Sequence, residues 1–445
     1  MDSAVVPISI VYYRKNKPEN ISETIEYCAP KTYVKSNVID GLVIDSTDIK
    51  FLPRHECQKP DTKIWKIGMW GNLQDFNLIM NLNNSKSNID LSSYFEQNNW
   101  ISGAGLNGDS QHKDFVPTPI IATKAIKRYY TPDNFAMLNC DYYRKINDSL
   151  FTPPFVILKK GQKERQITAS YIDYKAYCKS GAFIINKNDK QSDDIKKALV
   201  AFINSNLATY YLFLSASSWG IEREQIFFNE YLELPSFFLD NQDLNAVISL
   251  FDKLLAELKK DFPDKHLIEQ IENAINAELY DVIGLTKKEQ ILIQDALNFS
   301  LDLFEQGENS IGFKRTLIAE NKAYADMLCN ELNDFLQYSP LKVNATIYDV
   351  QLNNPLNLVV ISFDNKRMPI ISKSVTELAS DLEKLDNFSM QEKGQNIYVR
   401  KQFRYYDTNK VYLIKPNQKR FWTCSQAVDD ALSLTIEITN MGGDI

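Results

Sequence analysis

The four residues Thr152–Phe155, Thr-Pro-Pro-Phe, form a motif whose residue types could act on a nucleic-acid base. The motif differs at one position from Asp, Asn or Ser followed by Pro-Pro and an aromatic residue. In that arrangement the polar side chain and a backbone carbonyl hold the amino group of a flipped base, and the aromatic ring stacks on it. Thr152 is a poor substitute for the polar residue. We therefore expect a structural role, in which Pro153 and Pro154 fix an extended approach to the strand that follows.

A second motif, Gly-Ala-Gly-Leu-Asn-Gly at 103–108, has the glycine spacing of loops that bind dinucleotides or S-adenosylmethionine. Such a loop has to leave a hydrophobic strand and begin a helix, so that backbone amides and the helix dipole face the ligand. The flanking segments, EQNNW and DSQHKDF, fit neither element. We expect a flexible glycine loop here, and no catalytic or cofactor-binding residues in this chain.

The six cysteines are scattered without a C-x-x-C pair, and the three histidines have no cysteine or carboxylate at ligand spacing. Neither a disulfide framework nor a metal site is expected. No apolar run reaches the roughly 18 residues that a transmembrane helix needs. The N-terminus lacks the basic and apolar regions of a signal peptide. These features predict a cytoplasmic protein without membrane contact.

Basic residues are concentrated in one segment of an acidic chain. The formal net charge of −7 argues against a simple nucleic-acid binder. Residues 119–187, however, hold 12 Lys or Arg and 5 Asp or Glu, a net charge of +7, whereas residues 241–445 hold 22 and 30, a net charge of −8. Long cations beside a glycine turn suit phosphate contacts, although a solvated hairpin tip would have the same composition. The candidate DNA-binding cations are Lys159, Lys160, Lys163 and Arg165 around Gly161, together with Lys124, Lys127, Arg128, Arg144 and Lys145 among tyrosines.

The stretch Ser217–Arg223, SSWGIER, is the third unusual segment. A Trp-Gly turn that leaves a helix could present Trp219 and Arg223 to a DNA groove, and we include both among the candidate DNA-binding residues. Equally, Trp219 could fill the junction between a helix and a strand, with Arg223 in an ion pair. The sequence leaves both interpretations open.

The periodicity predicts an α+β, multidomain fold with four regions. These are a docking region (1–118), a β-rich target-recognition domain (119–240), a helical spacer (241–338) and a small α/β C-terminal domain (339–445). Strand-like runs occupy 5–13, 41–53 and 63–71, and a short helix is expected at 73–83 and a loop at 84–118. A helix is expected over 192–217, and after 340 four strand-like runs alternate with helices at 373–386 and 425–440.

In their order, these segments resemble the C-terminal half of the large N6-adenine DNA methyltransferases of restriction–modification systems (type IIG-like). That half holds the target-recognition domain. Residues 7–32 resemble the last strands of the methyltransferase domain, and GLVIDSTDIKFLP and IWKIGMWGNLQDFNLI resemble the connecting region. LFTPPFVILKKG, AFINSNLATYYLFLSASSWGIEREQI and YLELP resemble the recognition domain, and LNAVISLFDKLLAEL and INAELYDVIGLTKKE resemble the helical spacer. YLIKPNQKRFWTCSQAVDDA resembles a C-terminal module of some members.

In that family the cofactor loop and the Asn-Pro-Pro-Tyr-type motif precede these segments. The resemblance therefore implies a DNA-specificity subunit of a restriction–modification or anti-phage system. It would not be an enzyme on its own and would work with a separate S-adenosylmethionine-dependent adenine methyltransferase subunit. Expected partners are double-stranded DNA, that methyltransferase and, as a further partner, a nuclease or helicase. We expect the strand at 5–13, together with 41–71, to dock on the methyltransferase, because an unpaired apolar strand normally finds a partner.

Two alternatives remain open at this point. One is an atypical or split N6-adenine DNA methyltransferase or restriction enzyme that a partner completes. The other is a protein-binding scaffold of a defence complex, which the acidic C-terminal half would suit.

Overall fold

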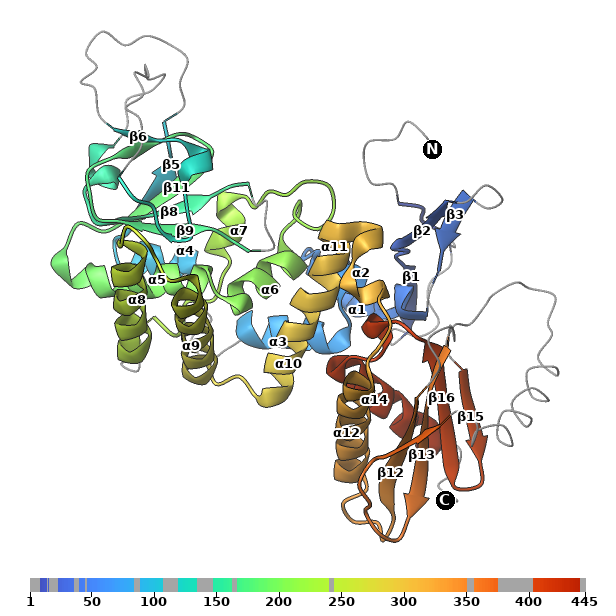
Figure 1. Ribbon diagram of the computed structural model, residues 1–445. Helices are drawn as coiled ribbons and strands as arrows, with labels where there is room; N and C mark the ends of the chain where they lie inside the picture. The colour runs from blue at the N-terminus through green and yellow to red at the C-terminus, as the bar shows by residue number, and fades with distance from the viewer. Residues whose placement is uncertain are drawn as a thin grey trace. The chain divides into compact units, whose positions relative to one another are not determined.

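The computed structural model of the chain contains two compact units, each with helices and sheets (Figure 1). Unit 1 comprises Met1–Ile21 and Gln58–Leu297, and unit 2 comprises Ser22–Cys57 and Asn298–Ile445. This architecture confirms the α+β, multidomain fold class; the four functional regions expected from the sequence remain predictions. The residues that the structure describes are 9–13, 15, 23–35, 40–44, 46–83, 89–106, 119–133, 147–161, 166–239, 244–349, 356–374 and 403–440.

The centre of unit 1 is a five-stranded sheet in the order β5-β11-β8-β9-β7. Neighbouring strands are antiparallel except β7 and β9, which are parallel. A short parallel pair, β6 and β10, lies outside this sheet. The strands are β5 (Ile101–Ala104), β6 (Ile120–Ile121), β7 (Tyr129–Tyr130), β8 (Phe155–Lys159), β9 (Ala169–Ile172), β10 (Tyr177–Cys178) and β11 (Ala182–Asn186).

The strand β8 shows why this part of the sequence reads as continuous apolar runs. Its first four residues are fully buried, because both faces of the sheet are covered. Phe155 and Ile157 pack into one cluster with Ile184 of β11, and β8 also contacts the helix α5 (Figure 1). The predicted β-rich character of 119–187 is confirmed for the described residues.

The helix expected over 192–217 is two helices, α5 (Asp193–Ile203) and α6 (Asn206–Ser215). Asn204 interrupts them, because its side chain bonds to the amide and the carbonyl of Ala169 at 3.0 and 2.8 Å. Ser205 then caps α6 by accepting a bond from the amide of Ala208. Within the described chain no single helix is long and apolar enough to span a membrane, and only the bent pair Lys190–Ile203 and Asn206–Ser215 passes by length and composition.

Further helices complete unit 1 and confirm the predicted helix at 73–83 and the helical character of 241–297. They are α2 (Lys63–Trp70), α3 (Leu73–Asn83), α4 (Leu91–Gln97), α7 (Phe228–Leu232), α8 (Asn245–Leu258), α9 (Lys265–Ile283) and α10 (Lys287–Asp295), with the 3₁₀ turns η2 (Thr123–Ala125), η3 (Asp148–Phe151) and η4 (Lys190–Ser192). A π-helical turn, η6 (Ala296–Leu301), follows α10.

Three expectations for the N-terminal part were wrong. Residues 63–70 form the helix α2, although their β-branched and aromatic content favoured a strand; Ile64 and Ile67, three residues apart, are buried on one face. The expected loop at 84–118 contains α4, which Asp90 caps by accepting a bond from the amide of Ser93 at 2.8 Å, and β5. Residues 9–13 of the expected strand at 5–13 are described and adopt no strand, and the other residues of that segment lie outside the described residues.

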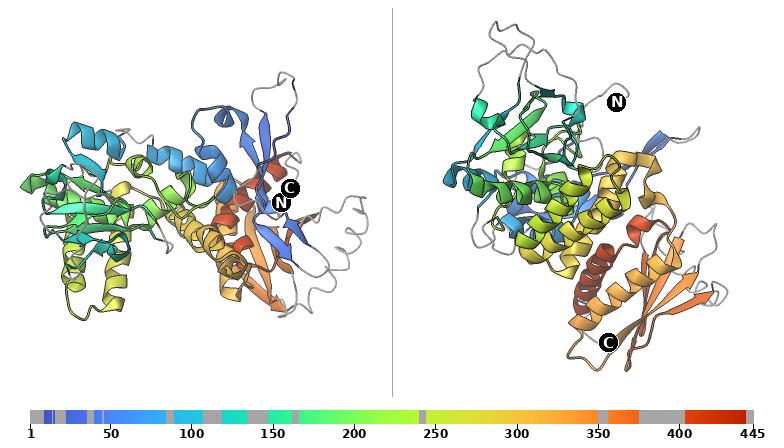
Figure 2. Two further views of the ribbon diagram at one scale, coloured as in Figure 1. Left: turned by 90° about the horizontal axis from the view of Figure 1, so that it is seen from above. Right: turned by 60° about the vertical axis from the view of Figure 1, so that its left-hand side comes forward.

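Unit 2 is built on a second five-stranded sheet in the order β14-β12-β13-β16-β15. The helices α12 and α14 cover one face and form a shared core with the sheet (Figure 2). The strands are β12 (Lys342–Asp349), β13 (Leu356–Asp364), β14 (Ile371–Ser374), β15 (Phe403–Asp407) and β16 (Lys410–Pro416); the helices are α11 (Asp302–Gln306), α12 (Ile318–Phe335) and α14 (Cys424–Asn440), with the turns η7 (Gly307–Asn309), η8 (Ile311–Phe313) and η10 (Lys419–Phe421). The predicted helix at 425–440 is confirmed. The helix predicted at 373–386 falls outside the described residues except for 373 and 374, which belong to β14.

Two antiparallel pairs from the N-terminal part also belong to unit 2, so the strands predicted within 41–53 are confirmed. Lys31 forms an ion pair with buried Asp48 at 3.0 Å and ties the two pairs together. The elements are β1 (Thr24–Cys28), β2 (Thr32–Lys35), β3 (Asp40–Val43), η1 (Ser46–Asp48), β4 (Ile49–Pro53) and the short helix α1 (Arg54–Cys57).

A buried charge network joins β15 and β16 to α14 in unit 2. Asp430 is 2% exposed; it pairs with Lys415 and with Arg404 at 3.1 Å and accepts a hydrogen bond from the Tyr324 hydroxyl at 2.6 Å. Burial alone would raise the pKa of Asp430, but Lys415 and Arg404 hold it below its ordinary value. The ionised carboxylate is therefore the form that the fold requires.

We expect Asp430→Asn to lower the free energy of unfolding by about 3–5 kcal/mol, because it leaves Lys415 buried without its anion. Urea unfolding of the full chain, followed by tryptophan fluorescence, measures this change. Asp334→Asn, at an exposed position of α12, is the matched control and should change the value by less than about 0.5 kcal/mol. A loss as small as the control's would show that the network does not stabilise unit 2.

Candidate nucleic-acid interface

Three lysine-bearing segments meet at one end of the unit 1 sheet. Lys159 ends β8 and lies opposite Ala182, the first residue of β11. The amide of Lys160 donates to the carbonyl of Gly181 at 3.1 Å, and the amide of Ala182 donates to that of Lys179 at 3.0 Å. A Cβ on Gly181 would lie 2.8 Å from Oγ1 of Thr123. Thr123, which precedes Lys124, therefore lies next to the same end of the sheet. We call Lys124, Lys159, Lys160 and Lys179 the basic end.

The basic end has the charge and the exposure that phosphate contacts require. Lys124 and Lys179 are exposed, and Nζ of half-buried Lys160 lies 4.9 Å from the ring centroid of Phe227. Cations that reach phosphates release counterions from DNA, which gives affinity without sequence preference.

A loop at 216–227, which we call the anchored loop, lies next to the basic end. Its first half is fixed by α2. Nζ of Lys66, a residue only 6% exposed, donates to the carbonyl of Ala216 at 2.6 Å and to that of Trp219. Nε1 of Trp70 donates to the carbonyl of Gly220 at 2.6 Å. Gly220 has φ +81°, and a Cβ there would lie 2.9 Å from the ring of Phe213, so the turn requires glycine.

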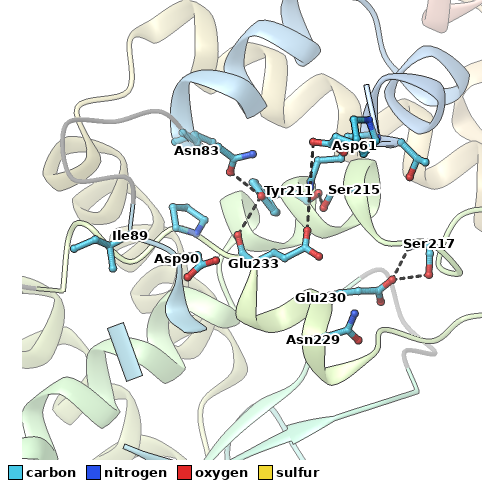
Figure 3. Close-up of a pocket in the computed structure, with 15 residues that line it drawn as sticks. Asp61, Asn83, Ile89, Asp90, Tyr211, Ser215, Ser217, Asn229, Glu230 and Glu233 are labelled. Atoms are coloured by element: carbon cyan, nitrogen blue, oxygen red, sulfur yellow. Dashed lines mark hydrogen bonds and ion pairs between the residues drawn. The ribbon is translucent and has the colours of Figure 1, made fainter. Parts of the chain in front are cut away.

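The two ends of the anchored loop are held together by Glu230 of α7. One carboxylate oxygen accepts bonds from the amide and hydroxyl of Ser217 at 2.7 and 2.6 Å, and the other accepts from the amide of Phe227 at 2.6 Å. The pair of Ser217 and Glu230 is visible in Figure 3. One buried carboxylate thus closes the base of the loop.

The tip of the anchored loop, Ile221–Glu224, is exposed, and the loop returns directly to the basic end. The carbonyl of Ser218 accepts bonds from the amides of Ile221 and Glu222, both at 3.1 Å. Beyond the tip, Gln225 pairs with Gly161, and the amide of Ile226 donates to the carbonyl of Lys160 at 3.0 Å. The fold therefore places a fixed, exposed tip beside a group of lysines.

A pocket of about 610 Å³ in unit 1 has the opposite charge (Figure 3). Lys63 pairs there with Glu233 at 3.0 Å and with Asp61 at 3.5 Å, and the Tyr211 hydroxyl lies 2.7 Å from Oδ1 of Asn83. With four carboxylates against one lysine, the pocket disfavours phosphate. Its lining residues are Pro60, Asp61, Thr62, Lys63, Leu82, Asn83, Ile89, Asp90, Tyr211, Ser215, Ser217, Asn229, Glu230, Glu233 and Pro235.

The cations predicted from the sequence occupy different environments. Lys127 is exposed. The guanidinium of Arg128 is bound within unit 1: it pairs with Glu272 of α9 at 3.0 Å and donates to the carbonyl of Asn204 at 2.8 Å. Of the predicted set, Lys124, Lys159 and Lys160 belong to the basic end. Arg144, Lys145, Lys163 and Arg165 lie outside the described residues.

The two candidate residues of SSWGIER, Trp219 and Arg223, also lie in different environments. Trp219 is 1% exposed and packs edge-on against Phe213, 5.7 Å between ring centroids, so its ring fills the junction after α6 and is not presented to solvent. The side chain of Arg223 is 65% exposed and lies 3.3 Å from a carboxylate oxygen of Glu222. Of the two interpretations of Trp219, the structure agrees with the buried one, whereas a DNA contact by Arg223 stays a prediction.

Sequence reasoning missed four residues of this interface: Lys66, Trp70, Lys179 and Glu230. Lys66 stands among apolar residues in KIWKIGMW, which could have indicated a buried lysine. Because this segment was predicted to be a strand, its buried helical face was not recognised. Lys179 was counted in the charge of 119–187 and not singled out. Nothing local to Glu230 indicates that it accepts bonds from Ser217, 13 residues away.

The two motifs that suggested chemistry lie in ordinary structural positions. The prediction that a strand follows Pro153 and Pro154 is confirmed, since β8 begins at Phe155, whose buried ring packs on Phe151 at 6.0 Å between centroids. Gly103 lies within β5, which corrects the expected glycine loop. A Cβ on Gly105 would lie 2.3 Å from the carbonyl oxygen of Lys179, so this glycine permits a close backbone approach.

Among the described residues, no three or more His, Cys, Asp or Glu side chains are grouped so that they could hold a metal ion.

Comparisons with known proteins leave the family of the chain open. No family model and no curated protein matches it. One solved structure that aligns with it is described as "Structural basis underlying complex assembly and conformational transition of the type I R-M system", with 11% identity and a TM-score of 0.25 over 51% of this chain and 50% of that chain. Another is the type I restriction-modification system S subunit from M. genitalium, with 8% identity and a TM-score of 0.21 over 77% of this chain and 90% of that chain. This chain thus spans about half the length of the first. Both TM-scores are below 0.5, so neither alignment establishes a shared fold or function.

The burial of Lys66 predicts a pH-dependent stability. Burial lowers its pKa from 10.5 to about 7, partly opposed by Glu230. Between pH 7 and 10.5 the unfolded chain therefore binds the proton that the folded chain has lost, so raising the pH favours the folded state. We expect the free energy of unfolding of the wild type, relative to Lys66→Met, to rise between pH 7 and pH 9.5 in urea titrations.

Lys63 on the same helix provides the control. Burial opposes its charged form, but Glu233 and Asp61 raise its pKa above 10.5, so the Lys63→Met difference should stay constant from pH 7 to pH 9.5. If the Lys66 difference is equally flat over this interval, its amine titrates normally in the fold.

Proposed function

We propose that unit 1 recognises double-stranded DNA and that the chain is the specificity subunit of a methyltransferase-based restriction–modification or anti-phage system. The observation that carries the DNA-binding part is the basic end beside the anchored loop. The whole chain has a net charge of −7, and DNA would repel it if this charge were spread evenly over the surface. The local exception is the place where three lysine-bearing segments meet and the backbone also presents an exposed tip.

The two features of this interface can divide the work of recognition. Lysines on phosphates supply affinity and fix the register of the protein on the duplex. The tip of the anchored loop is held by α2 and α7, so it can meet the floor of a groove in one fixed position. A flexible tip would have to be ordered on binding, at a cost in conformational entropy.

The partner assignment rests on the motif order that resembles the C-terminal half of N6-adenine DNA methyltransferases. In this proposal a separate subunit binds S-adenosylmethionine and transfers the methyl group, while this chain selects the DNA sequence. The buried ring of Phe155 supports a non-catalytic role for Thr152–Phe155, because a ring enclosed in a core cannot stack on a flipped base.

DNA binding is tested by the triple variant Lys124→Ala, Lys160→Ala and Lys179→Ala in the full chain. Each phosphate contact contributes about −0.9 to the slope of log affinity against log salt on B-DNA, so the slope should flatten by roughly 2–3 units. Fluorescence anisotropy with a labelled duplex of randomised sequence, at several salt concentrations, measures the slope. The loss should be the same on every sequence tested.

The control is a second triple variant, Lys253→Ala, Lys265→Ala and Lys287→Ala, which removes three exposed lysines from α8, α9 and α10. It removes the same net charge from unit 1 and should leave the slope within about 0.5 of the wild type if those lysines touch no phosphate. Equal slopes for the wild type and the first variant would place DNA binding elsewhere or exclude it.

The catalytic alternative is tested separately. We expect no transfer of radiolabelled methyl groups from S-adenosylmethionine to duplex DNA by the purified chain. The control is the double variant Pro117→Ala and Pro119→Ala. Incorporation that is kept in this control but lost in the double variant Pro153→Ala and Pro154→Ala would show that the chain is itself a methyltransferase.

A further inference from the structure

We propose that the tip Ile221–Glu224 reads base edges at a G·C pair, and that Lys66 and Trp70 are positioning residues that fix this tip relative to the basic end. The inference deepens the proposed function and rests on it. It concerns which atoms discriminate between sequences, whereas the basic end concerns affinity for any duplex.

The charge of the tip argues for bases and against phosphates as its target. Glu222 and Glu224 flank Arg223, so the tip carries a formal charge of −1 next to lysines. Two carboxylates close to the phosphate backbone would weaken binding. In the major groove, by contrast, guanine O6 and N7 accept from arginine, and cytosine N4 donates to a carboxylate. A Glu-Arg pair therefore matches both members of a G·C pair.

Arg223 is available for this contact. Its guanidinium pairs with Glu222 at 3.3 Å, and its side chain is 65% exposed. An exposed ion pair of this kind contributes little and can be exchanged for guanine at small cost. Ile221, 36% exposed, adds an apolar group that could contact a thymine methyl at a neighbouring pair.

The tip needs an external support, because its own bonds are local. The amides of Ile221, Glu222 and Arg223 all turn back to one carbonyl, that of Ser218, at 3.1, 3.1 and 3.3 Å. This turn is fixed to the rest of unit 1 by α2, through Lys66 on the carbonyls of Ala216 and Trp219 and Trp70 on that of Gly220. The two α2 residues lie about 150 positions earlier in the chain.

Base-edge readout is sensitive to such support. Productive geometry at a binding site has to be held within about 0.5 Å, and a loop reaches this precision only when neighbouring groups fix it. Phosphate contacts by long lysine side chains tolerate more movement. Loss of Lys66 or Trp70 should therefore reduce discrimination between sequences more than it reduces affinity for DNA in general.

The first experiment tests positioning without DNA. Lys66→Met keeps the length of the side chain and removes the donor, and Trp70→Phe keeps a ring against Phe213 and removes the N–H. Hydrogen–deuterium exchange of the full chain should show the amides of 221–223 exchanging at least about 10-fold faster in both variants, with unchanged protection of β8 and β11. Unchanged exchange at 221–223 overturns the positioning role, as does a uniform loss of protection across unit 1.

The second experiment tests reading. A duplex pool with a randomised core is selected on the wild type, Arg223→Ala, Lys66→Met and the control Lys253→Ala. We expect the wild type and the control to enrich a site that contains guanine. Arg223→Ala should lower the preference at that position about 10-fold, and Lys66→Met should lower it while changing non-specific affinity less than about 2-fold.

The salt slope separates the remaining outcomes. If Arg223 contacts a base, Arg223→Ala leaves the slope unchanged; if it contacts a phosphate, the slope flattens by about 1 and the reading role is overturned. DNA binding without any sequence preference in the wild type overturns the reading role and leaves the proposed phosphate contacts standing. No DNA binding by the wild type overturns the proposed function, and the exchange data still decide the positioning role.

Discussion

The buried amine of Lys66 is the contact on which the arrangement of the interface depends. A chain that leaves the buried helix α6 exposes carbonyl groups which no following helical turn can satisfy, and an unpaired carbonyl inside a protein is costly. From the neighbouring helix α2, Lys66 donates to two carbonyls of the segment that leaves α6, those of Ala216 and Trp219. The direction in which the chain leaves α6 is thereby set by α2, and the return towards the end of β8 follows from that direction.

The same device recurs elsewhere in the fold. Asn204 interrupts two buried helices and joins them to β9, Glu230 closes the base of a loop, and Asp430 holds two cations in unit 2. In each case one buried polar side chain makes several bonds, and in a buried place each bond is stronger and each unmade bond costs more. Apolar burial gives these units their stability, and the buried polar groups select one arrangement of the connecting segments.

The sequence predicted those elements whose apolar period agrees with their burial. The helix at 73–83, the strand after Pro154 and the helix at 425–440 are of this kind. It failed where a buried polar residue interrupts the period: Lys66 lies on the buried face of α2, and a pattern that treats lysine as exposed cannot find that face. It also could not show that Arg128 has its partner in Glu272, 144 residues later, because local charge gives no information on distant carboxylates. Among the described residues of 119–187, the charge of Arg128 is therefore paired within the fold and is not available to the candidate interface.

The placement of α6 has a consequence for how unit 1 is synthesised and folds. This helix packs against α2, which precedes it in the sequence, and against α10, which follows it. The helix α10 also contacts α3. Contacts between segments so far apart in the chain form late, since each requires the closure of a long loop. While the chain is being made, α6 leaves the ribosome about 70 residues before α10, so the part of its apolar surface that packs against α10 is uncovered at that stage. Chaperones bind uncovered apolar surface of this kind, and a recombinant fragment cut before α10 would keep it uncovered.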